Sequence, residues 1–169
     1  MKKLMRLFSL LCLCAVTVAM GCATSAPREG SDARNLPDPP SLRRVKPIGP
    51  GFQPATAEIR ALKGRAWVAY SGSHWVPLRA RETLEAGSVV AVERNSHVDI
   101  FLGRNGPLLR ATAGTVFAIN ALALKESESG PIIDTEFFLQ RGRLLGNVDR
   151  LHPASRYRVM SPAGQAEVK

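Results

Sequence analysis

The chain has 169 residues, 45% of them hydrophobic, which is enough for one domain with a real core plus a leader and a linker. Aromatic residues make up only 6%, so aliphatic strands must supply most of that core. The formal net charge of +9 falls to +6 (9 − 3) once Lys2, Lys3 and Arg6 leave with an export leader. The basic residues are scattered, with one of the tightest pairs at Arg141 and Arg143. This pattern favours solvated surface over an anionic membrane, a cell-wall polymer or nucleic acid.

Residues 1–21 have the pattern of an export signal. After a basic start, residues 7–20 are mostly apolar and uncharged, and they are too few for a membrane span, which needs about 20 apolar residues. The small residues before Cys22 resemble a bacterial lipobox, although Ala19 stands where Leu is usual. We therefore predict that Cys22 is acylated and becomes the mature amino terminus. The alternative is an ordinary secretory leader with Cys22 as a free thiol.

The cysteine count agrees with a lipid anchor. Cys12 and Cys14 lie in the apolar part of the leader and would be removed with it, which leaves Cys22 as the only thiol. One cysteine cannot form an intrachain disulfide, even in an oxidising compartment. The expected location is the cell envelope, with the domain facing the periplasm or the exterior. Since Ala23 follows the cysteine, outer-membrane sorting is expected in a Gram-negative cell, by resemblance to known lipoproteins.

Residues 22–55 are predicted to be a disordered, proline-rich linker. They show no apolar period, and such a segment cannot bury enough surface to offset the entropy of ordering it. Prolines stiffen an unfolded chain, so the segment is expected to act as a semi-rigid tether. Its prolines are Pro27, Pro37, Pro39, Pro40, Pro47, Pro50 and Pro54.

Residues 56–169 are predicted to form an all-β domain of short strands joined by Gly-rich turns. The clearest strand has Val98 and Ile100 on one face and His97 and Asp99 on the other, which is the period of a half-buried strand. The expected strands are residues 64–70, 75–78, 89–92, 96–102, 108–111, 116–119 with an apolar run to 124, 132–140, 144–148 and 157–162 running into 163–168, and residues 57–62 are a first strand or one turn of helix.

Several pieces follow one another in a recognisable order. They are Gly64-Arg65-Ala66-Trp67-Val68, Trp75-Val76-Pro77-Leu78, Leu84-Glu85-Ala86-Gly87-Ser88-Val89-Val90, Ser96-His97-Val98-Asp99-Ile100, Leu109, Thr115, Leu139-Gln140-Arg141-Gly142-Arg143-Leu144-Leu145 and Tyr157-Arg158-Val159-Met160-Ser161-Pro162-Ala163-Gly164-Gln165-Ala166-Glu167-Val168-Lys169. Their order and spacing resemble a FecR-type domain over nearly two thirds of the chain. In that family the last piece usually has Thr and Arg where Ser161 and Lys169 stand, and it continues with Gly-Thr.

The resemblance implies an extracytoplasmic all-β domain of curled-sheet or β-solenoid-like form. Some family members relay an outer-membrane signal to a sigma factor through a cytoplasmic helical segment and a membrane span. This sequence shows a leader and a linker in their place, so the resemblance favours an exported envelope protein over a sigma-factor regulator. Since the family motif runs on past Lys169, we expect the last strand to be short or unpaired if the domain continues beyond it.

No cofactor or metal site is expected. His74, His97 and His152 are far apart in sequence, whereas a zinc site needs a clustered set of ligands. His97 and Asp99 share one strand face, but a metal held there would need more ligands from elsewhere.

No catalytic set is visible, and we expect that the protein is not an enzyme. Residues 103–106 are predicted to be a turn and not a phosphate cradle, because no helical pattern follows them. Glu126 and Glu128 lie in a polar loop without apolar surroundings that would suit acid–base work. Trp67 and Trp75 are predicted to be packing residues, with an exposed sugar-stacking platform as the alternative.

Two functions of different classes remain open from the sequence. The first is a non-catalytic module, held at the membrane by Cys22, that binds or senses an envelope protein or a cell-wall glycan. The second is a structural spacer or assembly component of the envelope. Nucleic acid is not an expected partner. An exposed strand edge or an aromatic surface patch would favour the first, and a fully polar surface the second.

Overall fold

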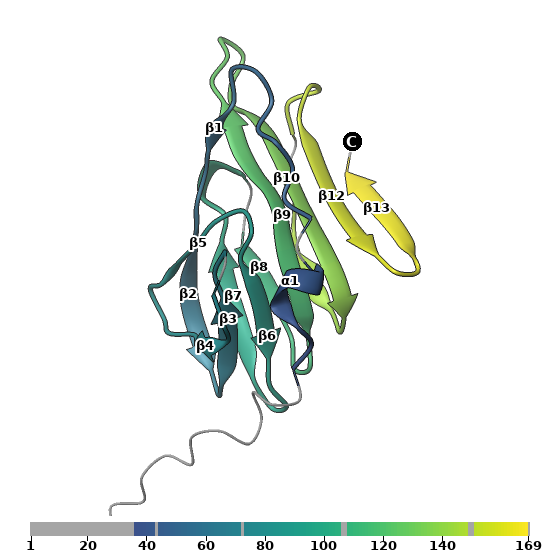
Figure 1. Cartoon of the computed structure of the whole chain (residues 1–169). Coiled ribbons are helices and arrows are strands. Elements are labelled where there is room, and N and C mark those ends of the chain that lie inside the picture. The colour runs from purple at the N-terminus through teal and green to yellow at the C-terminus, as the bar shows by residue number, and fades with distance from the viewer. Residues whose placement is uncertain (1–35, 43, 72, 106–107, 149–150, 169) are drawn as a thin grey trace, which may run out of the picture.

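The computed structural model describes residues 36–42, 44–71, 73–105, 108–148 and 151–168. These residues form two β-sheets, one short helix, α1 (Pro39–Leu42), and one 3-10 turn, Gly103–Asn105 (Figure 1). The all-β prediction is therefore confirmed. The export signal, Cys22 and the first part of the expected linker lie outside the described residues.

The larger sheet holds eight strands and the smaller sheet five. The larger contains β1 (Gln53–Pro54), β3 (Ala66–Ala69), β4 (Val76–Pro77), β6 (Val89–Val92), β9 (Val116–Lys125), β10 (Ile132–Arg141), β12 (Arg156–Ser161) and β13 (Gly164–Val168). The smaller contains β2 (Ala57–Lys63), β5 (Thr83–Leu84), β7 (His97–Phe101), β8 (Leu108–Ala111) and β11 (Leu144–Gly146). Their orders are β13-β12-β10-β9-β6-β3-β4, with β1 beside β9, and β11-β8-β7-β2-β5. Neither a closed barrel nor a solenoid is identified among the described residues.

One pairing is parallel, between β10 and β12, and the other described pairings are antiparallel. The chain leaves β10 and forms β11 in the other sheet before it returns to the larger sheet as β12. Parallel neighbours need such a crossover, because a tight hairpin can join only antiparallel strands. The crossover ties the two sheets together through the chain itself.

A single apolar core fills the space between the sheets. Val98 and Ile100 of β7 are fully buried in it, which confirms the face assigned to them by their alternation. Phe137 of β10 lies at its centre, 6.1 Å from the ring centroid of Phe117 and 6.0 Å from that of Tyr157. Burial raises the pKa of Tyr157 to about 12.

The larger sheet is also covered on its outer face. A second buried cluster there contains Ala69, Val89, Ala91, Val116, Ala118 and Phe138. Leu36, Trp67, Trp75 and Met160 pack against this cluster. The cover is the N-terminal segment, defined here as residues 36–42 and 44–56, which crosses the sheet beside β9 and β10 (Figure 1).

The prediction of a disordered linker does not hold for this segment. The backbone N–H of Lys46 donates to the carbonyl of Asn120 at 3.0 Å, and that of Ala55 donates to the carbonyl of Leu122 at 2.9 Å. β1 then pairs with the end of β9. The segment lacks an apolar period because its helix, α1, has four residues and its strand, β1, has two. The sheet beneath it supplies the apolar surface and the hydrogen-bond partners that order it.

The carboxyl end also differs from the expectation. The predicted strand over residues 157–162, running into 163–168, is a hairpin of β12 and β13 that turns at Pro162 and Ala163. β13 has five residues, and each of them has a partner on β12, so the last strand is short and is paired on one side. The opposite side of β13 is an edge of the larger sheet.

A candidate binding groove beside the N-terminal segment

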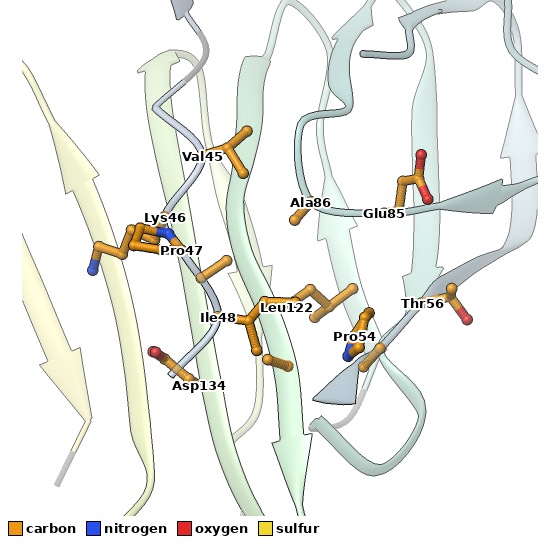
Figure 2. Close-up of a pocket in the computed structure, with 13 residues that line it drawn as sticks. Val45, Lys46, Pro47, Ile48, Pro54, Thr56, Glu85, Ala86, Leu122 and Asp134 are labelled. Carbon is orange, nitrogen blue, oxygen red and sulfur yellow. The ribbon is translucent and has the colours of Figure 1, made fainter. Parts of the chain in front are cut away.

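A groove of about 240 Å³ lies between the N-terminal segment and the larger sheet. Its lining residues are Val45, Lys46, Pro47, Ile48, Pro54, Ala55, Thr56, Glu85, Ala86, Ala121, Leu122, Ala123 and Asp134. Figure 2 shows Ile48 and Pro54 on opposite sides of Leu122. Val45 is 51% exposed and Ile48 48% exposed, so the apolar wall is open to solvent.

The lining is formed by three separate parts of the chain. Residues 45–48 lie on one side, and Glu85 and Ala86 of the turn before β6 lie across from them (Figure 2). β9 supplies the floor with Ala121 and Ala123, whose small side chains leave room above the sheet. The groove therefore exists only because the N-terminal segment is ordered on the sheet.

Asp134 adds one polar group to this apolar surface. It alternates with Ile133, which points into the core, so its side chain lies on the outer face of β10. Its Oδ1 atom is buried and accepts no hydrogen bond from any described residue. A buried acceptor without a partner costs free energy, and an N–H donor from a bound molecule would satisfy it.

A buried charge cluster lies next to the groove on the same face. Glu136 is 1% exposed, and its carboxylate forms an ion pair with Lys46 of the N-terminal segment. Arg158 Nη1 is 3.5 Å from Glu136 Oε2, and Asn120 Nδ2 donates to Glu136 Oε1 at 3.3 Å. Arg158 also lies 3.7 Å from Glu167 of β13. The cluster links the N-terminal segment to β9, β10, β12 and β13.

Replacing Lys46 with Met should loosen this segment. The change removes the cation that lies nearest to the buried carboxylate of Glu136. The remaining partners are farther from that carboxylate, Arg158 at 3.5 Å and Asn120 at 3.3 Å. We expect a loss of about 1–3 kcal/mol, the usual cost of removing one partner from a buried polar group. Urea unfolding measures this loss, and Lys125→Met, at an exposed lysine on β9, should change stability by less than about 0.5 kcal/mol. Equal effects of the two variants would contradict the role given to Lys46.

The two tryptophans pack against the sheet, as their predicted role requires. Trp67 Nε1 donates to Glu93 Oε1 at 2.7 Å, and Trp75 Nε1 donates to the carbonyl of Pro37 at 3.0 Å. Both rings pack against the outer cluster together with Leu36. Neither indole is arranged as an open platform for a sugar ring.

Of the pair His97 and Asp99, the aspartate is bound to an arginine. Asp99 accepts two hydrogen bonds from Arg110 of β8, from Nε at 2.6 Å and from Nη2 at 2.7 Å. These bonds hold the pKa of Asp99 below its usual range, against the opposing effect of burial. Among the described residues, no group of three or more His, Cys, Asp or Glu side chains is placed to hold a metal ion.

Asp99→Asn should weaken the domain at neutral pH and remove part of its acid sensitivity. Because the folded-state pKa of Asp99 is lowered, its contribution is present above the unfolded value near about 4 and is lost as pH falls below it. The thermal midpoints of wild type and Asp99→Asn should therefore differ at neutral pH and converge towards about pH 2. Glu126→Gln, in the exposed pair with Arg104, is the matched control and should produce a smaller change at neutral pH.

The remaining candidate residues lie apart from the groove. His152 Nε2 is 2.9 Å from Ser129 Oγ, and His74 is exposed in the turn before β4. Glu126 is paired with Arg104 at 2.6 Å, and Glu128 is exposed in the same loop. None of the helical stretches in the described part of the chain has the length and apolarity of a membrane-spanning helix.

The groove and its buried charges were not predicted, although two signals in the sequence point to them. β6 and β9 are apolar on consecutive residues, which is typical of strands covered on both faces. Asp134 and Glu136 stand at alternate positions in an otherwise apolar strand, so they lie on one face and need partners there. Neither signal identifies the segment that supplies the cover and the lysine.

Comparison with known proteins gives no match to this chain among the protein-family models, the curated proteins or the solved structures.

Proposed function

We propose that this chain is an exported, lipid-anchored envelope protein whose β domain is a non-catalytic binding module. Its site is the groove beside the N-terminal segment, and its ligand is an apolar stretch of another envelope protein. The observation that carries the proposal is the half-exposed apolar wall of Val45 and Ile48 beside the unpartnered oxygen of Asp134. The FecR-type resemblance of residues 64–169 and the lipobox pattern before Cys22 support the location.

The size and chemistry of the groove favour a polypeptide over a glycan. Sites for whole small molecules usually measure about 300–1,000 Å³, and this groove, at about 240 Å³, suits one or two aliphatic side chains. A peptide N–H could donate to Asp134 while the side chain beside it fills the space above Ala123. Glycan binding commonly uses exposed aromatic rings, and both tryptophans are packed against the domain.

A photo-crosslinking amino acid at position 48 tests the site in producing cells. We expect one discrete protein adduct, because a true ligand places the same residues against Ile48 each time. The same crosslinker at Leu145, which is 47% exposed on the other sheet, should give no such adduct. An identical adduct pattern at both positions would overturn the assignment of the groove, and labelling of glycan alone would overturn the assignment of the ligand.

Filling the groove provides a second test with a matched control. Ala86→Phe places a ring in the groove, and Ala113→Phe makes the same chemical change in an exposed turn. Only Ala86→Phe should abolish the adduct formed at position 48. If the adduct persists in Ala86→Phe, the groove is not the binding site.

The anchor is tested separately. Cells that produce wild type or Cys22→Ala are labelled with an alkyne fatty acid, and label is expected only on the wild-type protein. Equal labelling of the two proteins would show that Cys22 is not the acylated residue.

A further inference from the structure

Four turns lie together at one end of the two-sheet domain. They are residues 63–65 where β2 leads into β3, 93–95 between β6 and β7, 112–115 between β8 and β9, and 141–143 where β10 leads into β11, and the first and last of these turns include the final residue of the strand before them. They form the end at which β2, β6 and β10 finish in Figure 1. We call these four turns the basic end.

Backbone hydrogen bonds hold the four turns against one another. The N–H of Glu93 donates to the carbonyl of Arg65 at 3.1 Å, which joins the first two turns. The N–H of Gly114 donates to the carbonyl of Glu93 at 3.3 Å, which adds the third. The N–H of Thr112 donates to the carbonyl of Arg143 at 3.1 Å, which adds the fourth. The backbone of the basic end is therefore held in one arrangement, from which its side chains project.

The charge of this surface is strongly positive. Its basic residues are Lys63, Arg65, Arg94, Arg141 and Arg143. Glu93 is its only acidic residue, so the formal charge of the four turns is +4 (5 − 1). The Glu93 carboxylate accepts hydrogen bonds from Arg65 Nε at 2.8 Å and from Trp67 Nε1 at 2.7 Å, so it is already occupied.

A wide hollow of about 730 Å³ opens at the basic end. Arg94 and Arg141 are exposed and line it, and neither forms an ion pair with a described residue. Leu36, the first described residue, lines the same hollow. The chain therefore enters the fold beside the exposed arginines.

The entry point determines which end of the domain an anchor would bring to a membrane. Leu36 follows Cys22 by 14 residues (36 − 22), and a chain of that length spans at most about 50 Å when fully extended. A lipid on Cys22 would thus keep Leu36, and with it the basic end, within about 50 Å of the bilayer, which raises the local concentration of the basic end at the membrane. Exposed charges interact across only about 8 Å at physiological ionic strength, so the charge acts once the basic end touches the bilayer.

We propose that the basic end docks on an anionic phospholipid surface and orients the domain on the membrane to which Cys22 tethers it. The geometry of this inference rests on the proposed anchor. Exposed arginines and a hollow that is more polar than apolar suit phosphate headgroups, whereas single-stranded nucleic acid would require stacking aromatic rings, and the four turns contain none. With the basic end on the bilayer, β12 and β13 lie along the side of the domain, away from the lipid (Figure 1).

The test uses the mature chain from residue 22 carrying Cys22→Ala, so that no acyl group contributes to binding. This protein is sedimented with vesicles of phosphatidylcholine alone or of phosphatidylcholine mixed with phosphatidylglycerol. We expect binding to the anionic vesicles only, weakening as salt is raised. Absence of binding to the anionic vesicles, or equal binding to both kinds, would overturn the inference.

Charge reversal locates the surface. Each basic residue near an anionic membrane contributes about fivefold in affinity, so Arg94→Glu with Arg141→Glu should weaken binding by about 25-fold or more. Lys125→Glu with Arg156→Glu makes the same change in net charge at two exposed positions. Both lie at the end of the larger sheet opposite the basic end, where Lys125 pairs with Ile132 and Arg156 with Asp134, so this double variant should weaken binding much less. Equal weakening by the two double variants would mean that net charge, and not the basic end, drives binding.

Two further outcomes are separable. If soluble polyphosphate competes for the protein as tightly as the vesicles bind it, the surface recognises polyanions in general and the assignment to lipid is overturned. Because the protein in the vesicle test cannot be acylated, the two proposals are tested independently. If this protein binds anionic vesicles but the wild type in cells takes up no fatty-acid label, docking by the basic end is supported and acylation of Cys22 is overturned. If the wild type is labelled but the vesicles are not bound, acylation of Cys22 is supported and docking by the basic end is overturned.

Discussion

Phe137→Ala is expected to destabilise the domain by about 3–5 kcal/mol, a large part of the stability of any small domain. Phe137 is fully buried, and its ring packs against Phe117 and Tyr157, so it joins three strands of the larger sheet. Truncation removes this aromatic contact area and leaves a cavity that a sheet hydrogen-bonded on both sides of β10 cannot close. Urea unfolding at neutral pH measures the loss.

A second readout reports the same cavity. Burial is the cause of the raised pKa of Tyr157, about 12, and opening the space beside its ring should lower that value towards about 10. Phe137→Leu retains most of the volume and should cost much less, and Leu145→Ala, at a half-exposed side chain, should change stability by less than about 0.5 kcal/mol. If Phe137→Ala and Leu145→Ala unfold at the same urea concentration, Phe137 is not the centre of the core.

Short strands with a clear alternation could be predicted from the sequence because one face of each is buried. In β7, Val98 and Ile100 point into the core, and Asp99 lies on the other face with its carboxylate on Arg110. Apolar residues at every second position indicate this arrangement, since side chains alternate across a strand. The alternation does not indicate which strands are neighbours in a sheet, so the crossover from β10 to β12 was not predicted.

The cover on the larger sheet could not be predicted from local pattern. Val90 faces the core between the sheets and Val89 faces the outer cluster, so β6 has no polar face. That observation requires a second layer but does not say which segment supplies it. The N-terminal segment contains many prolines, which resemble a tether in composition, and its order comes from long-range contacts such as that of Lys46 with Glu136.

The groove depends on these same long-range contacts. Ile48 and Ala123 are far apart in sequence, and nothing in the residues around either indicates that they share a wall. The basic end is similar, because Arg94 and Arg141 are scattered in the sequence and become neighbours only when the turns stack. A charge excess read from composition therefore underestimated the local density of charge.

The turn at residues 141–143 belongs to that stacked end, and Gly142→Ala should disrupt it at a cost of about 3–5 kcal/mol. Gly142 has a φ of +90°, a conformation that L side chains rarely adopt and that costs about 1–2 kcal/mol. A Cβ there would lie 2.4 Å from the Cα of Thr115 and 2.5 Å from its Oγ1. Thr115 Oγ1 also accepts from the N–H of Arg143 at 3.0 Å, so moving apart breaks a hydrogen bond between two turns.

Gly114→Ala is the matched control for this change. Gly114 has a φ of +73°, and a Cβ there would meet no heavy atom within 4 Å. Its substitution should cost only the conformational part, about 1–2 kcal/mol, so the difference between the two urea midpoints isolates the contact with Thr115. Because the nearest atom is a backbone carbon, adding Thr115→Ala to Gly142→Ala should recover little stability. A full recovery in that double variant would mean that the hydroxyl alone was in the way and that the two turns can separate without loss.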